Sequence, residues 1–145
     1  MSPNKTVLLI DDEQSFLEPL ADALVFEGYR VLKARTVEEA VNLLKSEHID
    51  LVTIDIMLDP GEGLSHKVNS HSSGLLLCRY VREKYPEIDA FSISVVSDSS
   101  TIKSIESLGI RFLRKGETPL RTVLNLLRSK LTGIAYSTDP DWRRR

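Results

Sequence analysis

Five residues whose side chains could take part in phosphate chemistry stand at or just after the ends of short, largely apolar stretches of the chain: Asp11, Asp12, Asp55, Ser97 and Lys115. Taken singly, each is an ordinary surface residue, turn former or helix cap. Three carboxylates brought together would repel one another unless a hard cation lay among them, and Mg²⁺ prefers such oxygen ligands. A cation there lets a phosphate dianion approach a carboxylate, while Lys115 supplies a fixed positive charge and Ser97 a hydroxyl for one phosphoryl oxygen. The set indicates phosphoryl transfer, which needs positioning and charge stabilisation more than acid–base catalysis.

The elements that would position these side chains alternate between strands and helices. Apolar runs predict five buried strands, at residues 7–10, 29–34, 49–54, 90–96 and 110–113. Three of the helices are expected to begin at the caps Ser15, Thr36 and Thr118, and the other two to span residues 75–85 and 99–108. Five such units with short connections predict a parallel sheet with helices on both faces. Ligands of these sheets bind beyond the carboxyl ends of the strands, which is where the five polar residues lie.

The composition predicts one domain and excludes several classes of protein. The chain has 145 residues, a formal net charge of −2 and a single cysteine. We therefore expect no general attraction to nucleic acid and no disulfide framework. No apolar run reaches the length of a membrane span and no secretory signal is recognisable, which predicts a cytoplasmic protein. The domain is expected over residues 5–132, with an extended, mobile loop at 59–73 and a C-terminal tail at 133–145.

Four segments, in order, resemble the signatures of response-regulator receiver domains of two-component signalling. They are Val7–Glu13, Leu51–Leu58, Val95–Ser97 and Phe112–Lys115. Each segment alone is weak evidence, but the combination is specific, and the resemblance covers residues 5–132. It implies a flavodoxin-like (βα)5 three-layer sandwich whose parallel five-stranded sheet has the order 2-1-3-4-5.

The resemblance also implies roles for the carboxylates. Asp55 would be the phosphoacceptor, and Asp11 and Asp12 would bind Mg²⁺ together with Asp55 and the backbone carbonyl of Met57. The only chemistry expected of the chain itself is Mg²⁺-dependent self-phosphorylation and self-dephosphorylation, so it is not expected to be an enzyme in the ordinary sense.

Three further residues would report phosphorylation. The resemblance implies that Ser97 is the switch hydroxyl, that Lys115 senses the phosphoryl group and that the rotamer of Phe112 changes with it. The donor would be a phosphohistidine on a sensor histidine kinase or a phosphotransfer protein, and the output would be contact with a downstream protein. We expect no nucleic-acid or membrane partner, and a monomer or a weak homodimer.

The sequence departs from the family pattern at three places. Pro60 stands five residues after Asp55 instead of four, Gly116 follows Lys115 where the family has proline, and the fourth helix is short by about a turn. These departures favour a rival hypothesis, a degenerate receiver that binds a partner constitutively without phosphotransfer; the intact set of five polar residues opposes it. A phosphatase working through an aspartyl phosphate needs a second Asp two residues after a first-strand nucleophile, and a flavodoxin needs a Ser/Thr-rich loop after strand one. The sequence has neither pattern.

Asp98 has two interpretations that the sequence leaves open. Its carboxylate could face the acceptor and slow the approach of a phosphate dianion, or it could cap the helix that begins near Ser99. Elsewhere, Cys78 is expected to pack in the core. His66 and His71 are not expected to bind a metal, because no further ligand stands at the required spacing.

Overall fold

The structure is a computed structural model that describes residues 4–58, 70–95 and 98–134. The predictions for Ser97, Pro60, His66, most of the extended loop and most of the tail lie outside the described residues. Strands and helices alternate in the described ranges: β1 Thr6–Ile10, α1 Gln14–Phe26, β2 Arg30–Ala34, α2 Val37–Ser46, β3 Leu51–Ile54, α3 Ser70–Lys84, β4 Asp89–Ser94, α4 Ser99–Ser107, β5 Arg111–Arg114 and α5 Leu120–Thr132.

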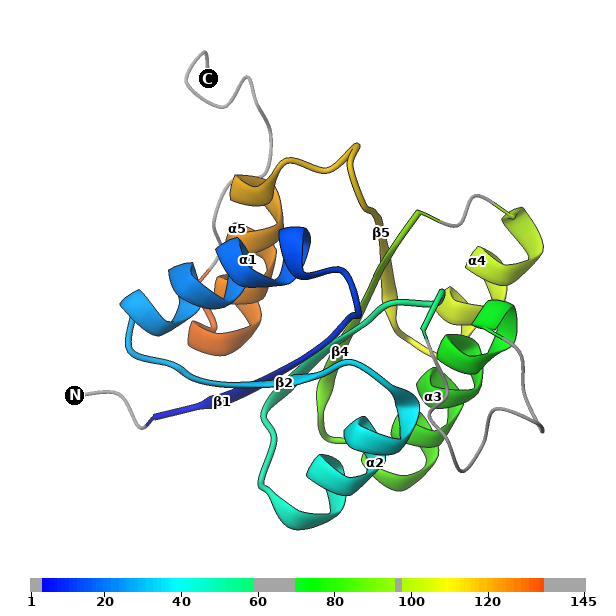
Figure 1. Cartoon of the computed structure of the whole chain (residues 1–145), viewed down its shortest axis with the longest axis horizontal. Coiled ribbons are helices and arrows are strands. Elements are labelled where there is room, and N and C mark those ends of the chain that lie inside the picture. The colour runs from blue at the N-terminus through cyan, green and yellow to red at the C-terminus, as the bar shows by residue number, and fades with distance from the viewer. Residues whose placement is uncertain (1–3, 59–69, 96–97, 135–145) are drawn as a thin grey trace.

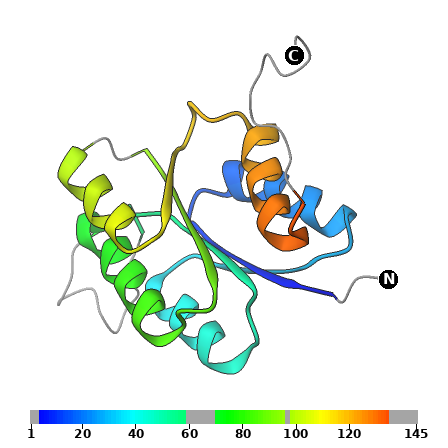
Figure 2. The same ribbon diagram turned by 180° about the vertical axis from the view of Figure 1, so that it is seen from behind.

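The strands form one parallel sheet in the order β2-β1-β3-β4-β5, as predicted. Helices α1 and α5 lie on one side of it and α2, α3 and α4 on the other, which gives three layers (Figure 1 and Figure 2). Strand β2 pairs with one edge of β1, and the chain then returns to place β3 along the other edge of β1. The direction of the strand order therefore reverses between β1 and β3. The crevice beyond their carboxyl ends is the expected place for a ligand in a sheet of this kind.

Two apolar clusters, one on each face of the sheet, make up the core. Successive residues of β1 point to opposite faces, so that Leu8 and Ile10 pack towards α2, α3 and α4, whereas Val7 and Leu9 pack towards α1 and α5. Cys78 is fully buried in the first cluster, as predicted. None of the helices in the described ranges is long and apolar enough to cross a membrane.

Helices α1 and α5 start within two residues of the predicted positions, but not at them. Helix α1 begins at Gln14 with Glu13 as N-cap, and the predicted cap, Ser15, lies inside the first turn. The start is fixed earlier because the Asp11 carboxylate accepts the Glu13 N–H at 2.8 Å. Helix α5 begins at Leu120, one residue later than a Thr118 cap would give. By contrast, the hydroxyl of Thr36 caps α2 as expected, accepting from the Glu39 N–H at 3.1 Å.

Helix α3 begins at Ser70, five residues before the predicted start, so residues 70–73 were wrongly assigned to the extended loop. Two contacts hold this first part of the helix against the end of β3. The buried hydroxyl of Ser73 donates to the Leu58 carbonyl, and the Gly74 N–H donates to the Ile56 carbonyl at 3.2 Å. The helix therefore starts directly beside the strand end that carries Asp55.

Candidate functional site

Three carboxylates meet beyond the carboxyl ends of β1 and β3. The two strands pair in register, Ile10 opposite Ile54, so the residues that follow them, Asp11 and Asp55, emerge side by side. Oxygen atoms of Asp11, Asp12 and Asp55 all lie within 4.8 Å of one another. Asp11 and Asp55 are buried and Asp12 is exposed, so the cluster has a closed inner side and one member that faces solvent.

Lys115, in the turn after β5, brings an ammonium group to this cluster. Its Nζ lies 2.7 Å from Asp11 Oδ2, 3.1 Å from Asp55 Oδ2 and 3.1 Å from Glu13 Oε1. Only 7% of its side chain is exposed, and the ring of Phe16 lies beneath the ammonium at 5.1 Å. A buried ammonium with three carboxylate partners compensates part of the negative charge that the site gathers.

Each buried carboxylate is held at both oxygens. Asp11 Oδ1 accepts the Glu13 N–H at 2.8 Å, and Asp55 Oδ1 accepts the Met57 N–H at 3.0 Å. The other oxygen of each, Oδ2, contacts Lys115. Both acids therefore use the backbone N–H two residues ahead to fix their orientation, a local turn that Asp forms readily. The Asp55 carboxylate is thus preoriented by the turn that contains Met57 and by Lys115.

The burial of these charges changes their acidity. Burial raises the pKa of Asp11 from 3.8 to about 6, against the opposing effect of its hydrogen bond from Lys115. Burial alone would lower the pKa of Lys115, but the hydrogen bond to Asp11 and the negative charge of Asp55 raise it above its usual value. The hydrogen bond from Lys115 lowers the pKa of Glu13. The ammonium is therefore charged throughout the physiological range, while Asp11 gains a proton readily as the pH falls.

The donor set fits a small, hard cation. All three side chains offer carboxylate oxygens, and the exposed Asp12 leaves one side of the cluster open to water, which Mg²⁺ retains in most protein sites. Within the described ranges, no cluster of three or more His, Cys, Asp or Glu side chains lies elsewhere with this geometry. Asp11, Asp12 and Asp55 are thus the residues that could hold the ion.

Gly74 of α3 packs directly against the backbone at the end of the acceptor strand. A Cβ at this position would lie 2.3 Å from the Ile56 Cα and 2.4 Å from the Asp55 carbonyl oxygen, far inside any allowed contact. Only glycine lets the helix approach the backbone of Asp55 and Ile56 this closely. Gly74 was not predicted, because it stands where a Ser/His-rich segment gives way to an apolar one and no local signal marks it.

The remaining predicted residues are placed as follows. Phe112 is half-buried in β5 and packs against the cluster on the α2–α4 face. Asp98 is the N-cap of α4: its Oδ2 accepts from the Thr101 hydroxyl at 2.7 Å and the Thr101 N–H at 3.3 Å, which supports the capping interpretation. Glu13 and Phe16 were not predicted as partners of Lys115. The only signal available in the sequence was their position, with Glu13 directly after Asp12 and Phe16 in the first turn of α1.

Comparison with known proteins identifies one matching family. The sequence model of the response regulator receiver domain family matches residues 7–124. A cyclic di-GMP phosphodiesterase of Thermotoga maritima is 30% identical over 128 residues, which make up 88% of this chain and 30% of that protein. The transcriptional regulatory protein YvrH of Bacillus subtilis is 29% identical over 98 residues, 67% of this chain and 36% of that protein.

Solved structures share the fold. A CheY-like response regulator receiver domain protein from Methanospirillum hungatei matches with a TM-score of 0.76 at 21% identity, over 90% of this chain and 96% of that one. The chain spans about a third of the length of the curated relatives it matches. The activities in those relatives' names therefore belong to whole proteins of which this chain resembles one part.

Proposed function

The chain belongs to the response regulator receiver domain family of two-component signalling, and from this premise we propose that Asp55 accepts a phosphoryl group in a Mg²⁺-dependent reaction. The observation that carries the proposal is the meeting of a preoriented, buried carboxylate with a lysine ammonium and two further acids at one strand edge. The degenerate-receiver alternative has no need of this arrangement.

The residues of the chain supply positioning and charge. In the proposed reaction, a carboxylate oxygen of Asp55 attacks the phosphorus of a phosphohistidine or acyl phosphate. The new bond is O–P, the donor's N–P or O–P bond breaks, and the leaving group keeps that electron pair. Lys115, 3.1 Å from Asp55 Oδ2, is close enough to move its ammonium onto the incoming phosphoryl oxygens.

A divalent cation bound by Asp11, Asp12 and Asp55 would neutralise the charge that gathers as a phosphate dianion meets these carboxylates. Without it, Lys115 is the only cation that contacts Asp11 and Asp55 in the described part of the chain. Four acids, with Glu13 included, face a single ammonium there, so loading from an anionic donor should depend on the metal.

Receivers of this family work with histidine kinases or phosphotransfer proteins, and we propose such a donor for this chain. The proposed output is phosphorylation-dependent contact with a downstream protein. Ser97 and Phe112 are the proposed switch residues, with Ser97 donating a hydroxyl hydrogen bond to the phosphoryl group and Phe112 changing its rotamer.

Mass spectrometry of the intact chain after incubation with acetyl phosphate and Mg²⁺ tests the proposal. We expect one added phosphoryl group in the wild type and none in Asp55→Asn or without Mg²⁺. Asp22→Asn, which neutralises an exposed acid of α1, is the matched control and should be labelled like the wild type. Equal labelling of Asp55→Asn would remove the assignment. A folded wild type that no phosphodonor labels would establish the degenerate receiver instead.

A further inference from the structure

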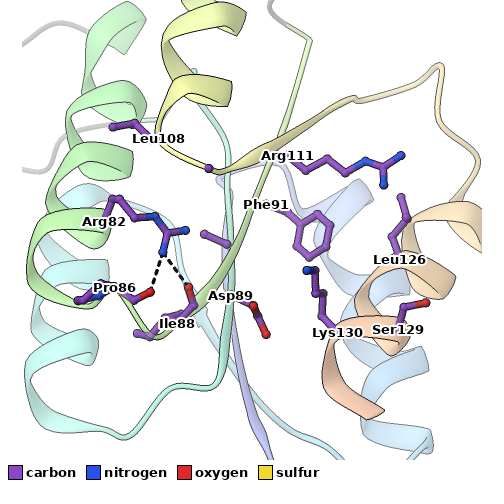
Figure 3. Close-up of a pocket in the computed structure, with 12 residues that line it drawn as sticks. Arg82, Pro86, Ile88, Asp89, Phe91, Leu108, Arg111, Leu126, Ser129 and Lys130 are labelled. Carbon is purple, nitrogen blue, oxygen red and sulfur yellow. Dashed lines mark hydrogen bonds between the residues drawn. The ribbon is translucent and has the colours of Figure 1, made fainter. Parts of the chain in front are cut away.

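A pocket of about 660 Å³ lies at the amino-terminal ends of the strands, opposite to the acceptor site at their carboxyl ends. Strands β4 and β5 begin at its lining residues Asp89 and Arg111, whereas Asp55 and Lys115 follow the other ends of the parallel strands. The C-terminal parts of α3 and α5 form its two sides. Figure 3 shows Arg82 entering from α3, Arg111 and Lys130 on the α5 side, and Asp89 with Phe91 between them. We call this the basal pocket; its volume is that of a typical small-molecule site.

The charged residues of the basal pocket are mostly cationic. Arg82, Arg111 and Lys130 line it together with one carboxylate, Asp89, although the whole chain has a net charge of −2. Within the described ranges, none of the three cations takes part in an ion pair. Positive charge is thus concentrated in a hollow, and in the part of the chain that the structure describes none of it is paired directly with a carboxylate.

Arg82 has the most constrained cationic group of the three. Its Nη1 donates to the main-chain carbonyls of Pro86 at 3.0 Å and Ile88 at 3.3 Å (Figure 3), and its Nε is buried without a hydrogen-bond partner. Neutral carbonyls orient the group but leave its charge uncompensated. An orientated arginine with free donor capacity suits a planar or tetrahedral anion.

Helix dipoles account for only part of this pattern. Arg82 and Lys130 lie in the last turns of α3 and α5, where a cation is favoured in any helix. Arg111 opens a strand and has no such role. The dipole also gives no reason for the three cations to share one hollow.

Apolar side chains form most of the rest of the wall. Ile88, Phe91 and Leu126 are buried residues that line the pocket, and Leu108 closes it from the α4–β5 connection. Leu108 is only half-buried, and a bare inorganic ion would not cover the apolar surface that it leaves open beside the three cations. We propose that the basal pocket binds an organic anion, a molecule that carries phosphate or carboxylate groups on an apolar body.

NMR titration of the full chain with phenyl phosphate, with isophthalate as the carboxylate counterpart, tests the proposal independently of phosphorylation. The buffer is Tris at low ionic strength. Metal is removed with a resin, because EDTA is itself a polycarboxylate and could compete for the pocket. Mg²⁺ is left out so that the acceptor site is inactive. We expect saturable shifts at the amides of Ile88 to Phe91 and of Arg111. Inorganic phosphate should bind more weakly, and neutral benzyl alcohol should not saturate; the ratio of the two organic probes tells which acidic group is preferred.

The double variant Arg111→Gln/Lys130→Gln should weaken phenyl phosphate binding roughly 5- to 25-fold, the effect of losing two exposed charge contacts. The control Lys45→Gln/Lys103→Gln removes the same charge from exposed sites on α2 and α4 and should change affinity less than 2-fold. Both mutated pocket residues are exposed, so the variant should keep a dispersed spectrum; Arg111→Gln alone replaces it if it does not. Shifts confined to the Asp11–Lys115 edge, equal affinity in the pocket variant and its control, or no saturable binding of either organic probe would overturn the proposal.

Discussion

Gly74→Ala is the substitution for which the structure predicts the opposite of the usual result. At most helical positions, alanine in place of glycine stabilises a protein by up to about 1 kcal/mol. Here the new methyl group would meet three backbone atoms: the Ile56 Cα at 2.3 Å, the Asp55 carbonyl oxygen at 2.4 Å and the Ile56 carbonyl oxygen at 2.6 Å. Because backbone cannot rotate away as a side chain can, α3 and the end of β3 must move apart.

The size of the effect follows from these distances. Ordinary contact begins near 3.4 Å, so the two elements must separate by about 1 Å. Overpacking of this kind costs about 1–3 kcal/mol, and backbone neighbours put Gly74→Ala at the upper end. After the gain in helix propensity, we expect about 2 kcal/mol of destabilisation, or a melting temperature lower by roughly 5–8 °C for a domain of this size. A displacement of about 1 Å at Asp55 should also slow phosphoryl transfer by roughly 10- to 100-fold.

Urea unfolding and acetyl phosphate loading of the same preparations measure both effects. Gly28→Ala is the control, because Gly28 has a φ of 97° and its added Cβ would meet nothing within 4 Å. It should lose about 1 kcal/mol through backbone strain alone and load at the wild-type rate. A Gly74→Ala protein that is as stable as the wild type and loads as fast would refute the close approach of α3 to the acceptor strand.

Two further predictions concern Asp98 and Asp11. Asp98→Ala should lower the melting temperature by roughly 2–5 °C through loss of the α4 cap, and stopped assays with acetyl phosphate should find its loading rate unchanged; faster loading would restore the guarding hypothesis. Burial raises the pKa of Asp11 to about 6, above its unfolded value, so its contribution to the stability of the metal-free fold is complete below about pH 4 and is lost as the pH rises through 6. Urea unfolding without Mg²⁺ should show that the free energy of unfolding falls by on the order of 2 kcal/mol between pH 4 and 7.5, and Asp11→Asn should abolish this fall. Mg²⁺ affinity should fall about tenfold per pH unit below pH 6. An Asp11→Asn protein whose free energy of unfolding falls as much as that of the wild type would contradict the assignment.

The sheet and the acidic cluster were predictable because both follow from patterns within strands. Apolar runs such as Val7–Ile10 can be buried only between two layers of helices, and parallel strands must end at one edge. Asp11 and Asp55 follow such runs, so their approach required no knowledge of side-chain packing. The fold and strand order were confirmed by the structure.

The start of α3 was not predictable in the same way. Residues 70–74, Ser-His-Ser-Ser-Gly, have the composition of a loop, and nothing local favours a helix. The helix is held by the Ser73 hydroxyl on the Leu58 carbonyl and by the Gly74 backbone against Ile56, contacts across a gap of 15 residues or more. Glu13 is a similar case. Its proximity to Asp12 was visible, but its partner Lys115 lies 102 residues away and is reached only through the completed sheet.

The glycine after Lys115 bears on whether the altered lysine turn argues for a degenerate receiver. Gly116 has a φ of 86°, which proline, fixed near −65°, cannot adopt, so this turn differs from one that a proline would form. Hydrogen bonds hold it instead: the Lys115 N–H donates to the Ser94 carbonyl at 2.9 Å and the Thr118 N–H to the Arg114 carbonyl at 3.0 Å. The side chain is then fixed by its carboxylate contacts and by the Phe16 ring. The ammonium still lies 3.1 Å from Asp55, so the lysine reaches the acceptor without the proline. The absence of the proline is therefore weak support for a receiver that has lost phosphotransfer.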